Sequence, residues 1–294
     1  MISNKLTGSW VALVTPMLDN GDIDFERLRS LIDWHIESGT DGVVVMGTTG
    51  ESATVSEQEY LAVIEASIQY ANGRIPVVAG CGSSSTEKAV SFARKINPFK
   101  PDGFLCVTPY YVKPSQSGLV IHFETLADVC EAPVLLYNVP GRTGVDLADS
   151  SIIQLAKHEN IVGIKDATGD LSRLEAIKDL SESFVLLSGD DETAFEFIQS
   201  GGHGVISVTA NVFPEAMKKW IELIDKSEHK AKIIFDILLP VHKAMFLESN
   251  PIPVKSALSI KKRIENGIRL PLTRANHETY KVIENVLREC SFSQ

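Results

Sequence analysis

The sequence lacks the features typical of membrane, secreted and nucleic-acid-binding proteins. No apolar run approaches the roughly 20 residues that a helix needs to cross a bilayer. The first ten residues, MISNKLTGSW, lack the charged and then apolar pattern of a signal peptide. Acidic residues outnumber basic ones, 38 against 28, and no basic stripe offsets the net charge of −10. We therefore expect a cytoplasmic protein without nucleic-acid or membrane partners.

The sequence also lacks the spacings typical of metal sites and disulfide frameworks. The four cysteines are far apart and form no CxxC pair, and the seven histidines show no HxxH or HExxH spacing. Cys106 lies inside an apolar run and is expected to be a buried core thiol. The sequence therefore predicts no metal and no disulfide framework.

What the sequence does contain is a recurrence of short apolar runs, each followed by an amphipathic stretch of helical length. The eight runs are Trp10–Thr15, Gly42–Met46, Pro76–Ala79, Gly103–Thr108, Val134–Val139, Ile161–Lys165, Phe184–Ser188 and Gly204–Val208. They are nearly continuous in Val, Ile and Leu, as parallel strands buried on both faces require. Eight strand–helix units close naturally into a (β/α)₈ TIM barrel. A doubly wound open sheet is the alternative, but its GxGxxG turn after the first strand is missing.

Helical patterns fill the intervals and continue beyond the last predicted strand. The helix candidates are Asp24–Ser38, Ser56–Tyr70, Ser84–Ile96, Gln116–Cys130, Asp170–Leu180 and Pro214–Ile224, followed by Ile233–Glu248, Val254–Glu265 and Thr273–Cys290. Ser56 and Ser84 each stand three residues before a glutamate, the spacing of a capping box. We expect residues 1–226 to form the barrel with the catalytic site. Residues 227–294 are expected to form a helical appendage packed on it.

Polar residues gather where the predicted strands end, which is where the active sites of such barrels lie. The segments concerned are GTTGES (Gly47–Ser52), TPYY (Thr108–Tyr111), YNVPGRTG (Tyr137–Gly144), GIKDATG (Gly163–Gly169), SGDD (Ser188–Asp191) and ISVTANV (Ile206–Val212). The polar residues of these segments are therefore the candidates for chemistry.

Lys165 is the most informative of these residues because it ends an apolar run. Burying an ammonium group is expensive, and the group escapes by losing its proton. The neutral amine is a nucleophile for a ketone, so the position favours a Schiff-base lysine. A lysine that extends into solvent or pairs with Asp166 is an equally acceptable interpretation of the residue taken alone.

Three further residues or segments could support a Schiff-base reaction. Tyr137 could pass protons near the lysine, although a lone tyrosine in an apolar run is more often a core residue. GTTGES offers hydroxyls and backbone N–H groups for a carboxylate, but such turns are common. Arg142 could hold a substrate carboxylate through its planar guanidinium, or could be an ordinary surface arginine.

These motifs, in this order and spacing, closely resemble the dihydrodipicolinate synthases, a family of pyruvate-dependent class I aldolases. The resemblance runs from TGSWVALVTPM to NPIPVK near Pro251, which is essentially the whole chain. It implies a lyase that condenses pyruvate with L-aspartate 4-semialdehyde and closes a ring, the first committed step of diaminopimelate and lysine biosynthesis. No cofactor is implied, since the protein's own iminium serves as the electron sink.

The resemblance also implies roles for individual residues. Lys165 matches the Schiff-base lysine, and Thr49, Tyr137 and Tyr111 match the proton relay. Thr48 and Thr49 match the pyruvate carboxylate site, and Arg142 matches the site for the aldehyde's carboxylate. Gly189 and Ile206 match positions that line the site through backbone carbonyls. In the family the tyrosine matching Tyr111 enters the neighbouring subunit's site, which implies a homo-oligomer, a dimer or a tetramer built as a dimer of dimers.

Two alternative functions remain at this stage. A related aldolase or lyase with another aldehyde is the nearer one, although sugar-acid lyases usually lack an arginine matching Arg142. A catalytically inactive barrel that serves as a binding protein is the other, but Lys165 and Tyr137 are both retained.

The sequence departs from the lysine-inhibited members of the family at the predicted effector site. An asparagine and a glutamate of those members are matched here by Ser84 and Lys88. Their histidines after the GTTGES segment are replaced by Glu57 and Tyr60, while Tyr110 is retained. The resemblance therefore implies weak or absent inhibition by L-lysine.

Overall fold

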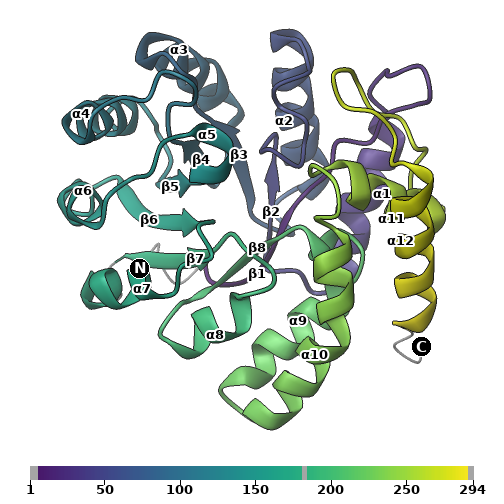
Figure 1. Ribbon diagram of the computed structural model, residues 1–294. Helices are drawn as coiled ribbons and strands as arrows, with labels where there is room; N and C mark the ends of the chain where they lie inside the picture. The colour runs from purple at the N-terminus through teal and green to yellow at the C-terminus, as the bar shows by residue number, and fades with distance from the viewer. Residues whose placement is uncertain (1–5, 181–183, 291–294) are drawn as a thin grey trace. The chain divides into compact units, whose positions relative to one another are not determined.

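The predicted barrel is confirmed. The computed structural model describes residues 6–180 and 184–290, and its eight parallel strands follow one another in chain order around a closed barrel (Figure 1). The strands are β1 (Gly8–Ala12), β2 (Gly42–Val45), β3 (Val77–Cys81), β4 (Gly103–Val107), β5 (Val134–Asn138), β6 (Ile161–Asp166), β7 (Val185–Ser188) and β8 (Gly204–Ser207). The closed order excludes the doubly wound open sheet.

Helices alternate with these strands and then continue to the C-terminal part of the chain. They are α1 (Phe25–Glu37), α2 (Glu57–Ala71), α3 (Thr86–Ile96), α4 (Gln116–Ala127), α5 (Pro140–Thr143), α6 (Asp149–Leu155), α7 (Ser172–Ile177), α8 (Ala194–Gln199), α9 (Pro214–Ile224), α10 (Glu228–Ala244), α11 (Ile252–Ile260) and α12 (His277–Glu289). Among the described residues, no helix is both long enough and apolar enough to cross a membrane.

The two capping predictions have different outcomes. Ser56 caps α2 in a complete capping box, with Glu59 bonding back to the backbone N–H of Ser56. The prediction for Ser84 is wrong by one residue, because Ser85 is the N-cap of α3 and accepts from the N–H of Lys88. Adjacent serines offer competing caps, and a helix start at Thr86 leaves no glutamate at the third helical position to complete a box.

The chain forms two compact units. The first consists of Pro76–Ile206 together with the start of the chain up to Gly8. Its parallel strands run from β3 to β8, and the β5–β6 register places Tyr137 opposite Lys165 and Asn138 opposite Asp166. Successive residues of a strand point to opposite faces, so the pairs Tyr137–Lys165 and Asn138–Asp166 lie on opposite sides of the sheet.

The second unit consists of Ser9–Ile75 together with the chain from Ser207 onward. Strands β1 and β2 pair within it, and a Cβ on Gly42 would lie only 2.2 Å from the Trp10 ring. The helices α9–α12 belong to this unit, where the Trp220 and Phe235 rings of α9 and α10 meet edge to face at 5.4 Å. The C-terminal helices thus group with the first two strands around a shared core.

Candidate active site

Lys165 and Tyr137 lie side by side in the first unit at the C-terminal ends of β6 and β5. Lys165 Nζ is 4.5 Å from the centre of the Tyr137 ring, and the two residues are only 5% and 7% exposed. The aromatic ring offers a polarisable face but no carboxylate to compensate a charge. The side chain of Lys165 is therefore enclosed against the ring and does not extend into solvent.

Asp166 does not occupy the same face as its neighbour Lys165. Its carboxylate accepts from the Thr168 hydroxyl at 2.5 Å and lies 3.3 Å from Arg173 Nε. Asn138 donates to Asp166 at 3.4 Å and to Asp146 at 2.8 Å. The residues that follow Tyr137 and Lys165 are thus tied together on the opposite face, which holds the two strand ends in register.

Gly189 lies against the Lys165 side chain. A Cβ at this position would stand 2.8 Å from Lys165 Cε and 2.7 Å from Ala167 Cβ, and its N–H donates to the Asp166 carbonyl at 2.6 Å. A glycine is therefore required to leave room for the lysine. Ile206 lies within β8, with a fully buried side chain.

Tyr111 and Arg142 are exposed on neighbouring loops of the same unit. Tyr111 is 88% exposed and has a φ of 74°, an uncommon conformation for a residue with a side chain. Its backbone N–H donates to the carbonyl of Thr143 at 3.1 Å, next to Arg142 in the short helix α5. The backbone of one loop therefore holds the other, while both side chains project outward.

Thr48 and Thr49 belong to a tight turn in the second unit, directly after β2. The N–H groups of Gly50 and Glu51 donate to the carbonyls of Gly47 and Thr48, both at 3.1 Å. Thr49 is 3% exposed and Thr48 is half-buried. The turn therefore presents one enclosed hydroxyl and one more accessible hydroxyl.

Two residues of the C-terminal segment that the sequence did not indicate, Asn250 and Lys255, reach this turn. Asn250 Nδ2 donates to Thr49 Oγ1 at 2.9 Å, and Lys255 forms an ion pair with Glu51. Burial lowers the pKa of Lys255, and the Glu51 carboxylate opposes that change. Lys255 carries the same signal as Lys165, a lysine in an apolar stretch, but its partner is distant in sequence.

Arg269 connects the same region to α2. Its guanidinium pairs with the Glu59 carboxylate at 2.8 Å and 2.5 Å, and its backbone N–H donates to Glu51 at 3.3 Å. The hydrogen bonds from Arg269 and Ser56 hold the pKa of Glu59 at about 2, below its usual value of 4.5. Glu59 therefore stays ionised at neutral pH and anchors the arginine.

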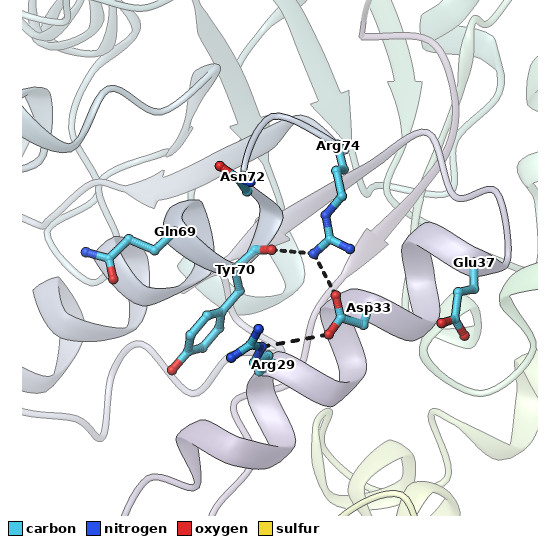
Figure 2. Close-up of a pocket in the computed structure, with 7 residues that line it drawn as sticks. All are labelled: Arg29, Asp33, Glu37, Gln69, Tyr70, Asn72 and Arg74. Carbon is cyan, nitrogen blue, oxygen red and sulfur yellow. Dashed lines mark hydrogen bonds and ion pairs between the residues drawn. The ribbon is translucent and has the colours of Figure 1, made fainter.

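A separate pocket of about 590 Å³ lies between α1 and α2 (Figure 2). It is lined by Arg29, Asp33, Glu37, Gln69, Tyr70, Asn72 and Arg74. Arg74 donates to the Tyr70 carbonyl and pairs with Asp33, each at 2.6 Å, and Arg29 approaches Asp33 at 3.9 Å. The pocket lies near the C-terminal ends of these helices, which lead into β2 and β3 at the inert end of such barrels. Arg29 and Arg74 both pair with Asp33, so the pocket gives no reason to assign it a substrate.

Comparison with known proteins identifies the family of the chain. The model of the dihydrodipicolinate synthetase family matches residues 5–290. The chain belongs to this family.

Members of the family resemble the chain over nearly its full length. The 4-hydroxy-tetrahydrodipicolinate synthase of Idiomarina loihiensis is 46% identical over 97% of this chain and 97% of its own. That of Saccharophagus degradans is 48% identical over 96% of this chain and 98% of its own. A crystal structure of the chloride-inhibited dihydrodipicolinate synthase from Acinetobacter baumannii, complexed with pyruvate, superposes with a TM-score of 0.95. It is 46% identical and covers 97% of this chain and 99% of that one.

Proposed function

We propose that this chain is a lyase that condenses pyruvate with L-aspartate 4-semialdehyde and closes the ring, the reaction of a 4-hydroxy-tetrahydrodipicolinate synthase. This activity places it in diaminopimelate and lysine biosynthesis, and the reaction belongs in the cytoplasm. The observation that carries the proposal is the buried amine of Lys165 beside the Tyr137 ring, 4.5 Å from its centre. The full-length relatives with this activity support it.

Lys165 performs the covalent chemistry in this proposal. Its amine attacks C2 of pyruvate, the carbinolamine loses water, and the resulting iminium acidifies the methyl group. Loss of a methyl proton gives an enamine, whose carbon attacks the aldehyde of the second substrate. The amino group of that substrate then attacks C2 and releases Lys165 as the ring closes. Tyr137 passes protons to and from the carbinolamine oxygen.

The hydroxyls of the Gly47–Ser52 turn supply the contacts to the pyruvate carboxylate. Because Thr49 Oγ1 already accepts a hydrogen bond from Asn250, its own proton is directed elsewhere and suits a carboxylate acceptor. A relay hydroxyl must accept and donate in turn, and the more accessible Thr48 meets that need better. We therefore favour Thr49 for carboxylate binding and Thr48 for the relay position that the family resemblance gave to Thr49.

Tyr111 and Arg142 complete the proposed site from exposed positions. Arg142 binds the carboxylate of the semialdehyde through its planar guanidinium. Tyr111 takes the relay position in the site of a second copy of the chain, and its 88% exposure and left-handed backbone are consistent with a side chain presented to a partner. Gly189 and Ile206 contribute backbone carbonyls. In this proposal the active unit is at least a homodimer, and the assembly is either that dimer or a tetramer formed from two dimers.

Reduction of the imine tests this function directly. Borohydride added with pyruvate is expected to leave one adduct per chain, on Lys165, identified by mass spectrometry of the digested protein. An adduct on another lysine, or no adduct, would refute the mechanism. Arg142→Ala should form the same adduct. Its kcat/KM for the semialdehyde should fall by the equivalent of ~1.5–3 kcal/mol. Normal use of the semialdehyde by this variant would point to a different aldehyde.

A further inference from the structure

The Gly47–Ser52 turn is attached to the C-terminal part of the chain at two points. Asn250, just before α11, donates to the hydroxyl of Thr49 at 2.9 Å. Lys255, within α11, donates to the carboxylate of Glu51, two residues after Thr49. The C-terminal segment thus contacts the turn at the hydroxyl proposed to bind pyruvate and again immediately beside it.

The Glu51–Lys255 ion pair is unusual in its burial. Both side chains are 0% exposed. Removing two charges from water costs free energy that their mutual attraction often fails to recover, so apolar residues in the same place would often stabilise the fold as well. Overall stability alone therefore gives a poor account of this pair, whereas fixing the geometry of the turn gives a direct one.

The ion pair can fix the turn in a backbone conformation that is uncommon. Glu51 has a φ of 57°, in the left-handed region that non-glycine residues seldom adopt. One oxygen of its carboxylate receives Lys255 and the other receives the Arg269 N–H at 3.3 Å. From the strand side, the Thr15 hydroxyl donates to the Gly50 carbonyl at 2.7 Å. The turn is therefore fixed on both sides.

The direction of the Asn250 hydrogen bond determines how the Thr49 hydroxyl points. An amide N–H can only donate, so Thr49 Oγ1 must accept from Asn250 and keeps its own proton for another acceptor. The pyruvate carboxylate is that acceptor in the proposed mechanism.

We propose that Asn250 and the Glu51–Lys255 pair are positioning residues for the pyruvate carboxylate, so that the C-terminal segment is part of the substrate site. This inference rests on the proposed function, since it assumes that Thr49 holds pyruvate. It predicts that disturbing these residues changes the KM for pyruvate more than kcat.

Two substitutions of Asn250 test the hydrogen bond. Asn250→Ala removes the donor and should raise the KM for pyruvate about tenfold, the size expected for one directed hydrogen bond. The kcat and the KM for the semialdehyde should change less than about twofold. Asn250→Asp has the same shape but accepts the Thr49 proton, so it should raise the KM for pyruvate further. An unchanged KM in both variants, or a fall in kcat alone, would overturn the proposal.

A double substitution tests the ion pair without leaving a buried unpaired charge. Glu51→Gln with Lys255→Met removes both charges and should keep the chain folded, as thermal unfolding can verify, while the KM for pyruvate rises several-fold. A folded double variant with the wild-type KM would overturn the role of the pair. If the double variant does not fold, the Asn250 variants decide the proposal.

Arg274→Ala is the matched control. Arg274 also joins the C-terminal segment to an early loop, pairing with Asp19 at 2.7 Å, but the side chains are 51% and 68% exposed. Its loss should leave the KM for pyruvate unchanged, and a rise equal to that in Asn250→Ala would overturn the specific role of Asn250.

Borohydride trapping distinguishes a failure of the proposed function from a failure of this inference. No pyruvate adduct on wild-type Lys165 would refute the proposed function. A normal adduct with an unchanged KM in the Asn250 variants would refute only this inference.

Discussion

At the scale of single residues, two lysines are buried in the described part of the chain, and their surroundings differ. Lys255 is paired with Glu51, and neither side chain has any exposed surface. Lys165 is 5% exposed and faces the ring of Tyr137. Lys255 is held by the Glu51 carboxylate, whereas Lys165 lies against an aromatic ring, which leaves its amine available in the proposed reaction. The partner, rather than the burial, therefore distinguishes the lysine proposed for catalysis.

Gly189 controls the room available to Lys165, which leads to a prediction. Gly189→Ala would place a Cβ 2.8 Å from Lys165 Cε and 2.7 Å from Ala167 Cβ, closer than such atoms approach in proteins. The lysine can move aside more easily than Ala167, so its amine should lose its alignment. We expect a destabilisation of ~1–3 kcal/mol and a slower formation of the pyruvate imine.

The rate of borohydride inactivation in the presence of pyruvate measures this effect. Gly141→Ala is the matched control, because a Cβ there meets nothing within 4 Å. Equal inactivation rates for Gly189→Ala and Gly141→Ala would show that the contact does not position the lysine.

At the scale of elements, the sequence predicted the strands well and the short helices poorly. Every predicted apolar run corresponds to a strand, because strands buried on both faces need continuous apolar residues. The helices α6 and α8 have seven and six residues, too few for a helical period to show, and no residue range was predicted for either. Helix α10 begins at Glu228 rather than Ile233, since its first turn is polar and carries no apolar periodicity.

The contacts around the Gly47–Ser52 turn could not have been predicted. Asn250 and Thr49 are 201 residues apart, and Lys255 and Glu51 are 204 apart. A strand-end rule locates polar residues that follow strands, and so it identified Thr49 and Lys165. It carries no information on which side chain of a distant helix will reach the turn.

A buried histidine between two helices leads to a prediction on pH. His122 of α4 bonds to Thr86 of α3 at 2.9 Å, and burial lowers its pKa from 6.5 to about 4. The unfolded chain therefore takes up a proton at this site at higher pH than the folded chain does. Its contribution to stability is fully present above pH 6.5 and is lost as pH falls toward 4. At ~1.4 kcal/mol per pH unit the loss reaches roughly 3 kcal/mol.

Denaturant unfolding between pH 7 and pH 4 checks this expectation. His122→Asn should show a shallower fall in the free energy of unfolding than the wild type. His35 has the same kind of site, with its pKa lowered to about 3 by burial and, to a lesser extent, by Arg263, and it should retain its own contribution in that variant. Parallel pH profiles of the free energy of unfolding for the wild type and His122→Asn would contradict the contribution assigned to His122. His277→Asn, a substitution at an exposed position, is the control.

At the scale of the whole molecule, the exposed Tyr111 leads to a prediction on assembly. If this side chain completes the relay of a second copy, dissociated chains should remain folded but lose most of their activity. Sedimentation and activity measured over the same dilution series should therefore show one common midpoint. Tyr111→Ala should lose activity while its assembly is retained. A fully active monomer, or full activity in Tyr111→Ala, would contradict the shared site.

Regulation by the pathway's end product leads to the last prediction, which concerns the start of α3. In the lysine-inhibited members that the sequence resembles, the effector's cationic groups need carboxylates and carbonyls around them. Here the matching positions hold Ser84 and Lys88, and Lys88 is an exposed residue in the first turn of α3. Exchanging a glutamate for a lysine removes an attraction and adds a repulsion, a change of ~1–3 kcal/mol against binding. We therefore expect L-lysine to inhibit weakly or not at all in a steady-state assay.

Two variants of α3 test this expectation. Lys88→Glu should increase the sensitivity to lysine. Lys95→Glu makes an equal change of charge near the other end of the same helix and should not. Submillimolar inhibition of the wild type, or equal responses of the two variants, would show that this site does not govern regulation.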